Sequence, residues 1–220
     1  MNDVRRIHVF VEGQTEETFI REVLYHYFFE KHLQLNPILI RTSSKGKGGA
    51  SNYEKIRWQI EEKCKEDRHS FITTMFDLFK LPKNFPGHAS LVNISDPYQK
   101  VEHLEKEWAN EINQGNFIPY ISLHEFEALL FSQLQKFEDW FDKNSVNKLE
   151  KERQQFDSPE HVNNGPETAP SKRISKYCIG YDKPLHGSLI SLSIGLDTIR
   201  DQCKHFDKWL KRLENLKKNN

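Results

Sequence analysis

Short apolar runs alternate with longer amphipathic stretches along the first 135 residues. The run at residues 7–11, IHVFV, consists of β-preferring residues and ends at Glu12-Gly13, which predicts a buried strand followed by a tight turn. Apolar side chains then recur every three or four positions, which predicts a helix over residues 15–32 with one face against a sheet. The first predicted unit is therefore strand, turn and helix.

The same alternation continues as far as residue 135. After a break at Asn36-Pro37, the predicted strands are residues 38–42, 71–77 and 117–122, and the predicted helices are residues 53–66, 98–111 and 124–131. Strands that are separated by helices are most simply parallel and joined by right-handed crossovers. Their apolar runs suit a sheet that is covered on both faces. The sequence thus predicts an α/β fold with a mostly parallel sheet flanked by helices.

The pattern changes beyond residue 135. The rest of the chain reads as helices at residues 143–155, 174–192 and 199–216, with a loop rich in Pro and Asn at residues 156–171. We therefore expect an α/β domain over residues 1–135 and an α-helical C-terminal extension over residues 136–220 that packs on it.

Composition narrows the class of protein. Hydrophobic residues make up 36% of the chain and aromatic residues 12%, which is too many for a solvated disordered chain. No apolar run approaches the ~20 residues of a membrane-spanning helix, and the N-terminus lacks the apolar segment of a secretory signal. The 3 cysteines form no CxxC pair, and their odd number favours a reducing compartment. We expect a globular, cytoplasmic protein without a membrane segment.

The charge is balanced overall and unbalanced locally. The 32 Lys and Arg residues equal the 32 Asp and Glu residues, which speaks against a uniformly basic nucleic-acid binder. Residues 96–160 hold 14 acids and 7 bases, a net of −7, whereas residues 200–220 hold 7 bases and 3 acids, a net of +4. A polyanion can therefore meet the basic flanks, with binding that is weaker and more dependent on metal than in a uniformly basic protein.

Acidic residues gather where the predicted strands end. Glu12 ends the first strand, Asp77 ends the third, and Glu125 and Glu127 follow the last within five residues. In open parallel sheets the ligand crevice lies at this edge, so we expect these carboxylates to converge. Carboxylates that lie close together repel unless a cation binds between them. All-oxygen ligation selects Mg²⁺, Mn²⁺ or Ca²⁺ rather than zinc.

Ordinary structural roles compete with this interpretation. Glu16 and Glu17 lie in the first turn of a helix, where the helix dipole favours carboxylates. Glu125 follows Ser122 with the spacing of a capping box, so its carboxylate could bond back to the backbone of Ser122. His124 is either a ligand or acid–base group or an ordinary polar residue at a helix start.

A glycine-rich stretch follows the second predicted strand. Lys45 and Lys47 lie in it among three glycines, on the same edge as the acids, and could hold phosphate. The stretch is not a P-loop, because no GxxxxGK[ST] follows the first strand, and a mobile solvated loop is the alternative. No G-x-S-x-G elbow or cysteine nucleophile signature is present, which leaves acyl transfer without support.

Several motifs resemble those of a known group of proteins. They are VEGQTE at residues 11–16, TMFDLFKLP at 74–82, HEFEALLF at 124–131, APSKRI at 169–174 and CKHFDKWL at 203–210. Together they resemble an uncharacterised prokaryotic family of small stand-alone proteins with a Rossmann-like topoisomerase–primase (Toprim) fold. The overcoming-lysogenisation-defect nucleases, which fuse an ATPase to a Toprim nuclease, are similar. The motifs span nearly the whole chain in order, which is more specific than any one of them.

The resemblance implies roles for individual residues. Toprim proteins use a glutamate after the first strand and an Asp-x-Asp after a later one to hold Mg²⁺ for breaking or joining phosphodiester bonds. Glu12 matches that glutamate, Glu16 the second acid of its motif, and Asp77 the first aspartate. Phe79 stands where the second aspartate belongs, so one carboxylate is missing and two-metal chemistry is in doubt. Glu125 or Glu127 would replace it. On a regular α-helix only one of the two would face the site, and Glu125 fits the strand-end geometry better.

These expectations combine into a functional hypothesis. The sequence favours a nuclease that depends on Mg²⁺ or Mn²⁺ and prefers DNA to RNA as its substrate. The resemblance adds a role in phage or plasmid defence beside an ATPase partner. Candidate phosphate-binding residues are Lys45, Lys47, Lys172, Arg173, Lys183 and His186. The alternatives are a catalytically reduced subunit that binds nucleic acid or docks on an ATPase, and a phosphotransferase or phosphohydrolase acting on nucleotides. The oligomeric state is left open, with a homo-oligomer among the options.

Overall fold

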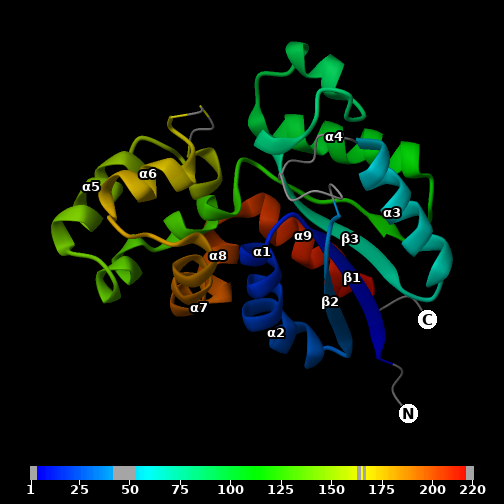
Figure 1. Ribbon diagram of the computed structural model, residues 1–220, viewed down its shortest axis with the longest axis horizontal. Coiled ribbons are helices and arrows are strands. Elements are labelled where there is room, and N and C mark those ends of the chain that lie inside the picture. The colour runs from blue at the N-terminus through cyan, green and yellow to red at the C-terminus, as the bar shows by residue number, and fades with distance from the viewer. Residues whose placement is uncertain (1–3, 42–52, 163–164, 166, 217–220) are drawn as a thin grey trace.

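The computed structural model describes residues 4–41, 53–162, 165 and 167–216. Its centre is a parallel sheet of five strands, in the order β2-β1-β3-β4, with β5 also paired to β3. The strands are β1 (Arg5–Val11), β2 (Leu33–Leu39), β3 (Phe71–Asp77), β4 (Phe117–Ile118) and β5 (Ile121–Ser122). The predicted α/β class, with a parallel sheet flanked by helices, is confirmed (Figure 1).

Helices account for most of the remaining chain. They are α1 (Gln14–Phe19), α2 (Tyr25–Phe29), α3 (Tyr53–Glu66), α4 (Pro97–Ile112), α5 (Lys143–Arg153), α6 (Pro170–Tyr177), α7 (Ser188–Ile194), α8 (Leu196–Gln202) and α9 (Lys204–Asn215). A π-helical turn, Ile20–Leu24, joins α1 to α2. The helix that was predicted over residues 174–192 is wrong in its extent, because the chain leaves helical geometry after α6 and re-enters it through a π-helical turn, Lys183–Gly187.

The second strand lies earlier than its apolar pattern predicts. We expected residues 38–42 after a break at Pro37, but β2 covers Leu33–Leu39 and pairs with all of β1, Pro37 facing Val9 in the register. Within the described part of the chain β2 pairs with β1 alone, so a residue without an N–H group can be accommodated on its other side. Pro37 did not mark a break in the strand, because the missing N–H group of a proline destabilises a central strand more than an edge strand.

The last predicted strand is split in two. Pro119 and Tyr120 separate β4 from β5, although both short strands pair with β3 without a shift in register. Pro119 cannot donate to the ladder. The hydroxyl of Thr74 bridges the break instead, donating to the carbonyl of Tyr120 at 2.8 Å and accepting from its amide at 2.9 Å. A side chain thus replaces the missing backbone pairing.

Each face of the sheet has its own hydrophobic core. Phe76 points to one face, where it packs with α3 and α4 around the buried Trp108. Val9 and Met75 point to the other, which is covered by α1, α2 and α9. Figure 1 shows α3 and α4 on one side of the strands and α9 crossing behind them. The last helix therefore packs directly on the sheet, while the proposed domain boundary near residue 135 stays a prediction.

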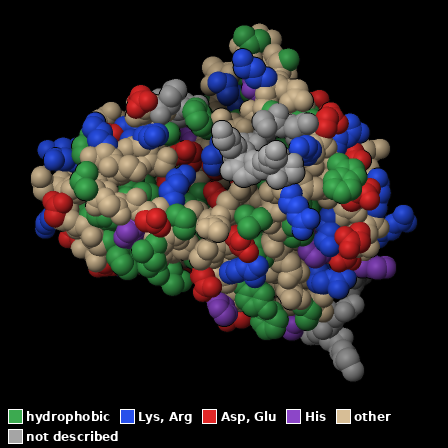
Figure 2. Space-filling model, viewed as in Figure 1, with side chains coloured by type: hydrophobic (Ala, Val, Ile, Leu, Met, Phe, Trp, Pro, Cys, Tyr) green, Lys and Arg blue, Asp and Glu red, His purple; other side chains and the backbone are tan. Residues whose placement is uncertain are grey.

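The surface reflects the balanced composition. Acidic and basic side chains are interspersed over the face drawn in Figure 2. None of the described helices combines the length and apolar character needed to cross a membrane.

A single hydrogen bond between sheet and helix offers a test of how α9 is attached. The indole of the buried Trp209 donates to the hydroxyl of Thr73 on β3 at 2.9 Å. Thr73→Val keeps the shape and leaves that buried donor unsatisfied, so we expect a loss of about 1–3 kcal/mol of unfolding free energy in urea. Thr18→Val, at a more exposed helical threonine, should change it by no more than about 0.5 kcal/mol. Equal losses in the two variants would contradict this attachment.

Candidate functional site

The carboxyl ends of β1 and β3 bring Glu12 and Asp77 together. The two strands are parallel neighbours, with Val11 facing Met75, so the residues that follow them meet at one edge. The amide of Asp77 donates a hydrogen bond to Oε2 of Glu12 at 2.9 Å. The side chain of Asp77 is only 2% exposed and that of Glu12 only 9%. The predicted convergence of these two acids is what the structure shows.

Lys80 completes this pair. A short 3₁₀ turn, Leu78–Lys80, follows β3 and returns the lysine toward the strand end. Its ammonium group lies 2.7 Å from Oδ2 of Asp77 and 3.9 Å from Oε2 of Glu12. The other oxygen of Asp77, Oδ1, accepts the backbone amide of Phe126 at 3.2 Å. Asp77 thus joins β3, its own lysine and the HEFEALLF segment.

Glu16 lies beside the same edge, in the first turn of α1. The carboxylate is buried, and a Cβ atom placed on Gly13 would come within 3.0 Å of its Oε2. Glycine at position 13 therefore leaves room for this carboxylate to lie over the turn. Glu17, by contrast, pairs with Arg21 at 2.9 Å one turn along the helix, as an ordinary surface residue would.

The HEFEALLF segment supplies two more buried carboxylates. Residues Phe126–Ser132 form a 3₁₀ helix rather than the predicted α-helix, and Glu125 precedes it in extended conformation. The capping-box alternative is wrong, because Oε2 of Glu125 accepts the amide of Ser171 at 3.0 Å. Glu127 is fully buried and pairs with Lys183 at 2.9 Å. The prediction that only one of these glutamates would face the site assumed a regular α-helix, which this segment does not form.

Burial dominates the electrostatics of the edge. It raises the pKa of Glu12 to about 8, with repulsion from Asp77 adding to the effect, and it raises the pKa of Glu16 in the same way. Burial likewise raises the pKa of Glu127 to about 7, although Lys183 opposes the rise. Burial alone would lower the pKa of Lys80, but Asp77 and Glu12 outweigh it and raise that pKa. Glu12 and Glu127 are thus poised to take a proton near neutral pH.

The fit of this group to a divalent cation is partial. Oxygen donors alone suit Mg²⁺ or Mn²⁺. Within the described ranges, however, no three Asp, Glu, His or Cys side chains are arranged to hold a metal ion. Lys80 lies between Asp77 and Glu12, where a bridging cation would be needed, and 40% of its side chain is exposed. For these acids to hold an ion, that ammonium group would have to leave them.

The other predicted phosphate-binding residues are distributed differently. Lys183 reaches the site through Glu127, whereas Arg173 pairs with Glu152 and donates to the carbonyl of Thr168. Lys172 is exposed on α6. His186 packs against aromatic rings and accepts the amide of Asp182 at its Nδ1. Lys45 and Lys47 lie outside the described residues.

His124 does not join the carboxylates in any hydrogen bond or ion pair among the described residues. Burial, with a contribution from His161, lowers its pKa to about 4, so its ring is neutral near pH 7. The ordinary polar role fits this position.

Sequence reasoning missed two residues of the site, Lys80 and Tyr181. The hydroxyl of Tyr181 is buried and has no hydrogen-bond partner among the described residues. A Cβ placed on Gly187 would come within 3.4 Å of this hydroxyl and 3.3 Å of the ring of Phe126, so the tyrosine lies against the HEFEALLF segment. Burial raises the pKa of Tyr181, which keeps it a neutral donor. Lys80 could have been found from its spacing, because it follows the acid at the end of β3 by three residues.

Comparisons with known proteins give three results. A family model described as a domain of unknown function, DUF4276, matches residues 11–214. No curated protein matches the chain. A solved structure of the C-terminal region of the OLD protein from Xanthomonas campestris pv. campestris aligns over 97% of this chain and 96% of that one, with 12% identity and a TM-score of 0.47. A likeness of this degree transfers no activity, and the predicted Toprim assignment stays a prediction.

The raised pKa of Glu12 predicts that its carboxyl group destabilises the folded protein as pH rises. A carboxyl whose pKa is higher in the folded than in the unfolded state binds its proton more tightly when folded, so its contribution to stability falls as pH rises between the two values. For Glu12 this window runs from 4.5 to about 8. Glu12→Gln removes the titration and keeps an acceptor for the Asp77 amide.

We expect the unfolding free energy of Glu12→Gln, relative to the wild type and without metal, to rise by about 2–4 kcal/mol between pH 5 and pH 8. Urea denaturation across this range measures it. Glu17→Gln, which replaces the carboxylate paired with Arg21, should show a nearly constant difference. A pH-independent difference for Glu12→Gln would contradict the raised pKa.

Proposed function

The chain belongs to the DUF4276 family of unknown function, and we propose that it is a divalent-cation-dependent enzyme that cleaves phosphodiester bonds in nucleic acid. One observation carries the proposal: buried carboxylates from four segments converge with two lysines at the carboxyl edge of a parallel sheet. These carboxylates belong to Glu12, Glu16, Asp77, Glu125 and Glu127. Open α/β sheets bind their ligands at this edge.

The energetic cost of the arrangement supports a functional role. Each ionised carboxylate that is taken out of water costs several kcal/mol unless charge and hydrogen bonds compensate it. Lys80 and Lys183 provide two positive charges for the five carboxyl groups. An arrangement selected for stability alone would use apolar side chains, so a ligand that brings positive charge is the natural complement.

The residues divide into three tasks in this proposal. Glu12, Asp77 and Glu125 are not arranged around a metal ion in the present geometry, and in this proposal they would hold Mg²⁺ or Mn²⁺ once Lys80 leaves Asp77. The bound ion would polarise a phosphoryl oxygen and favour a hydroxide nucleophile. Glu16, whose pKa burial raises, would accept a proton from the attacking water. Lys80 and Lys183 would neutralise the phosphate as they leave their carboxylate partners.

The proposal extends to the substrate, the partner and the biological role. We retain DNA as the preferred substrate and the cytoplasm as the location, and the sequence resemblance adds an ATPase partner and a role in phage defence. A nucleotide phosphohydrolase would use the same residues, and release of inorganic phosphate from nucleotides would distinguish it from polymer cleavage.

The test is cleavage of labelled single- and double-stranded DNA and RNA with Mn²⁺, with and without a candidate ATPase partner. Wild-type protein should cleave at least one polymer, and Glu12→Gln and Asp77→Asn should each reduce the rate by at least about 100-fold. Glu17→Gln is the matched control, because that carboxylate is paired with Arg21 outside the site. The proposal fails if wild type is inactive on all polymers or if Glu12→Gln is as active as Glu17→Gln.

Tyr181 provides a second, finer test of the site. Its partnerless hydroxyl lies among the same segments as the carboxylates, so Tyr181→Phe removes a donor without removing packing. We expect a decrease of roughly 10-fold or more in the cleavage rate with little change in unfolding free energy. Tyr177→Phe, which loses a bond to Glu152 outside the site, serves as control and should keep full activity. Full activity in Tyr181→Phe would assign the hydroxyl no part in the reaction.

One observation favours the alternative of a binding subunit without catalysis. Lys80 occupies the space between Asp77 and Glu12, and Phe79 stands in place of a further acid with 47% of its surface exposed. In that case the lysine permanently replaces the cation. Calorimetric titration with Mn²⁺ separates the two functions: carboxylate-dependent binding that Glu12→Gln abolishes supports the enzyme, and its absence in wild type supports the binding subunit.

A further inference from the structure

A second concave site lies on the flank of the sheet, away from the buried carboxylates. It is a pocket of about 280 Å³ between α4, α9 and the break that separates β4 from β5. Tyr120, at this break, lies between Ile118, which pairs with Thr73, and Ile121, which pairs with Phe76. The pocket therefore opens about two residues, or ~7 Å along the strand, before the end of β3 at Asp77.

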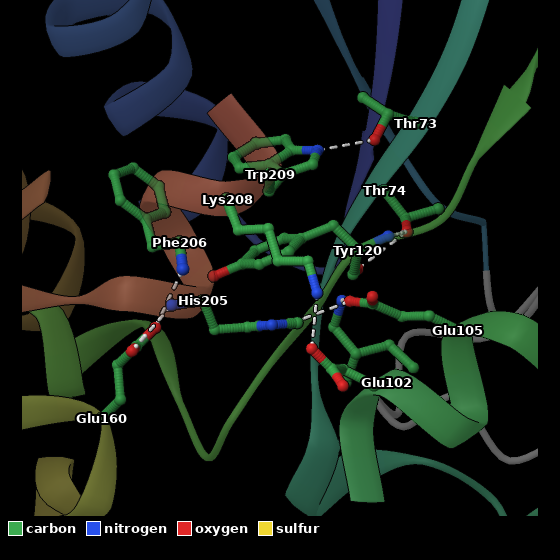
Figure 3. Close-up of polar contacts among 11 residues, drawn as sticks. Thr73, Thr74, Glu102, Glu105, Tyr120, Glu160, His205, Phe206, Lys208 and Trp209 are labelled. Atoms are coloured by element: carbon green, nitrogen blue, oxygen red, sulfur yellow. Dashed lines mark hydrogen bonds and ion pairs between the residues drawn. The ribbon is translucent and has the colours of Figure 1, made fainter. Parts of the chain in front are cut away.

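The floor of the pocket is a stack of three rings. The ring of Tyr120 lies between the imidazole of His205, at 5.2 Å, and the indole of Trp209, at 4.3 Å (Figure 3). All three residues are at most 5% exposed. The bond from Trp209 to Thr73 and the two bonds between Tyr120 and Thr74 tie this stack to β3. The floor is therefore rigid, and a ligand would meet it rather than reshape it.

The polar groups of the floor neutralise one another. Nε2 of His205 lies 2.9 Å from Oε1 of Glu105, which also accepts the amide of Ile121 at 2.9 Å (Figure 3). Burial would lower the pKa of His205, but the hydrogen bond and charge of Glu105 outweigh it and raise that pKa, which favours an imidazolium beside the carboxylate. The carboxylate of Glu160 accepts the amides of His205 and Phe206. The N-terminus of α9 is thus already satisfied from within the chain.

The rim, in contrast, carries unbalanced positive charge. Lys208 pairs with Glu102 at 2.6 Å across the mouth. Lys106 on α4 and Arg212 on α9 also line the pocket, and neither makes an ion pair with another described residue. With His205 and Glu105 cancelling, and Lys208 and Glu102 cancelling, these two cations leave a net charge of +2 around a small, rigid cavity.

We propose that this pocket binds a phosphate group, held by Lys106 and Arg212 at its rim. Arginine and lysine at a concave surface are the usual partners of phosphate, and a cavity of about 280 Å³ has room for such a group and the sugar that carries it. The phosphate belongs either to the backbone of a polynucleotide or to a free nucleotide. For a polynucleotide, the inference rests on the proposed function, since the strand would then cross from this flank to the carboxylate edge.

The first experiment measures binding in EDTA, where cleavage is excluded. Fluorescence anisotropy follows a labelled 20-nucleotide single strand and the matching duplex, and calorimetry follows adenosine monophosphate and inorganic phosphate. The double variant Lys106→Gln/Arg212→Gln should bind the polynucleotide at least about 10-fold more weakly. Its dependence of log Kd on log salt should be shallower by about 1.4–1.8, the value for two lost phosphate contacts.

A charge-matched control separates the pocket from general attraction. Lys143→Gln/Lys151→Gln removes two exposed lysines on α5 and the same net charge. This control should bind within about 2-fold of wild type. If both double variants weaken binding equally, the pocket proposal is overturned. If only the nucleotide and phosphate depend on Lys106 and Arg212, the phosphate site stands and its source is a free nucleotide.

A second measurement locates the ligand without relying on a variant. Titration with phosphate or oligonucleotide should shift the indole ¹H–¹⁵N signal of Trp209 and leave that of Trp58, on α3, in place. Equal shifts of both signals, or none at Trp209, would argue against this site. Glu12→Gln should retain the binding even though it loses cleavage, so failure of the enzymatic proposal and failure of the pocket are distinguishable.

Discussion

The amide of Asp77 donates to the carboxylate of Glu12, and the character of the whole strand edge follows from that contact. It forms because β1 and β3 are parallel neighbours that end together. Two carboxyl groups are thereby held side by side where little water reaches them, which makes negative charge costly. Two lysines of the chain offset part of this charge. Lys80, in the turn after β3, pairs with Asp77, and Lys183, about a hundred residues further on, pairs with Glu127. Any ligand of this edge must exchange with protons or with those two lysines.

Both parts of the chain contribute to this chemistry. Glu12 and Asp77 come from the sheet, whereas Lys183 and Tyr181 come from the segment between α6 and α7. Gly187 lets that segment approach α1 closely, since a side chain there would press within 3.1 Å of Thr15. At the same time α9 covers one face of the sheet through Trp209 and forms one wall of the flank pocket. The C-terminal helices are therefore structural partners of the sheet and of both sites.

Hydrophobic patterns in the sequence correctly predicted the strands whose formation depends on the burial of their own residues. The runs that end at Val11 and Asp77 form β1 and β3, because alternation of apolar and polar segments reflects which backbone is buried. The pattern failed where a neighbour decides the outcome. Pro37 is tolerated because β2 pairs with β1 alone within the described part of the chain, and Glu125 bonds to Ser171 rather than to its own helix. Arg173 pairs with Glu152, which lies 21 residues away and has no signature of its own.

By itself, the sequence determined the α/β class, the parallel sheet and the presence of acids at its carboxyl edge. It could do so because hydrophobic periodicity and the ends of strands depend on residues that are close together in the sequence. Only the tertiary structure decided which charges meet. Lys80 lies between Asp77 and Glu12, Lys183 neutralises Glu127, and His205 neutralises Glu105, whereas Lys106 and Arg212 have no ion-pair partner among the described residues. A charged side chain is stabilised by the groups that packing brings near it. Ion pairs between residues up to a hundred positions apart have no recognisable pattern in the sequence.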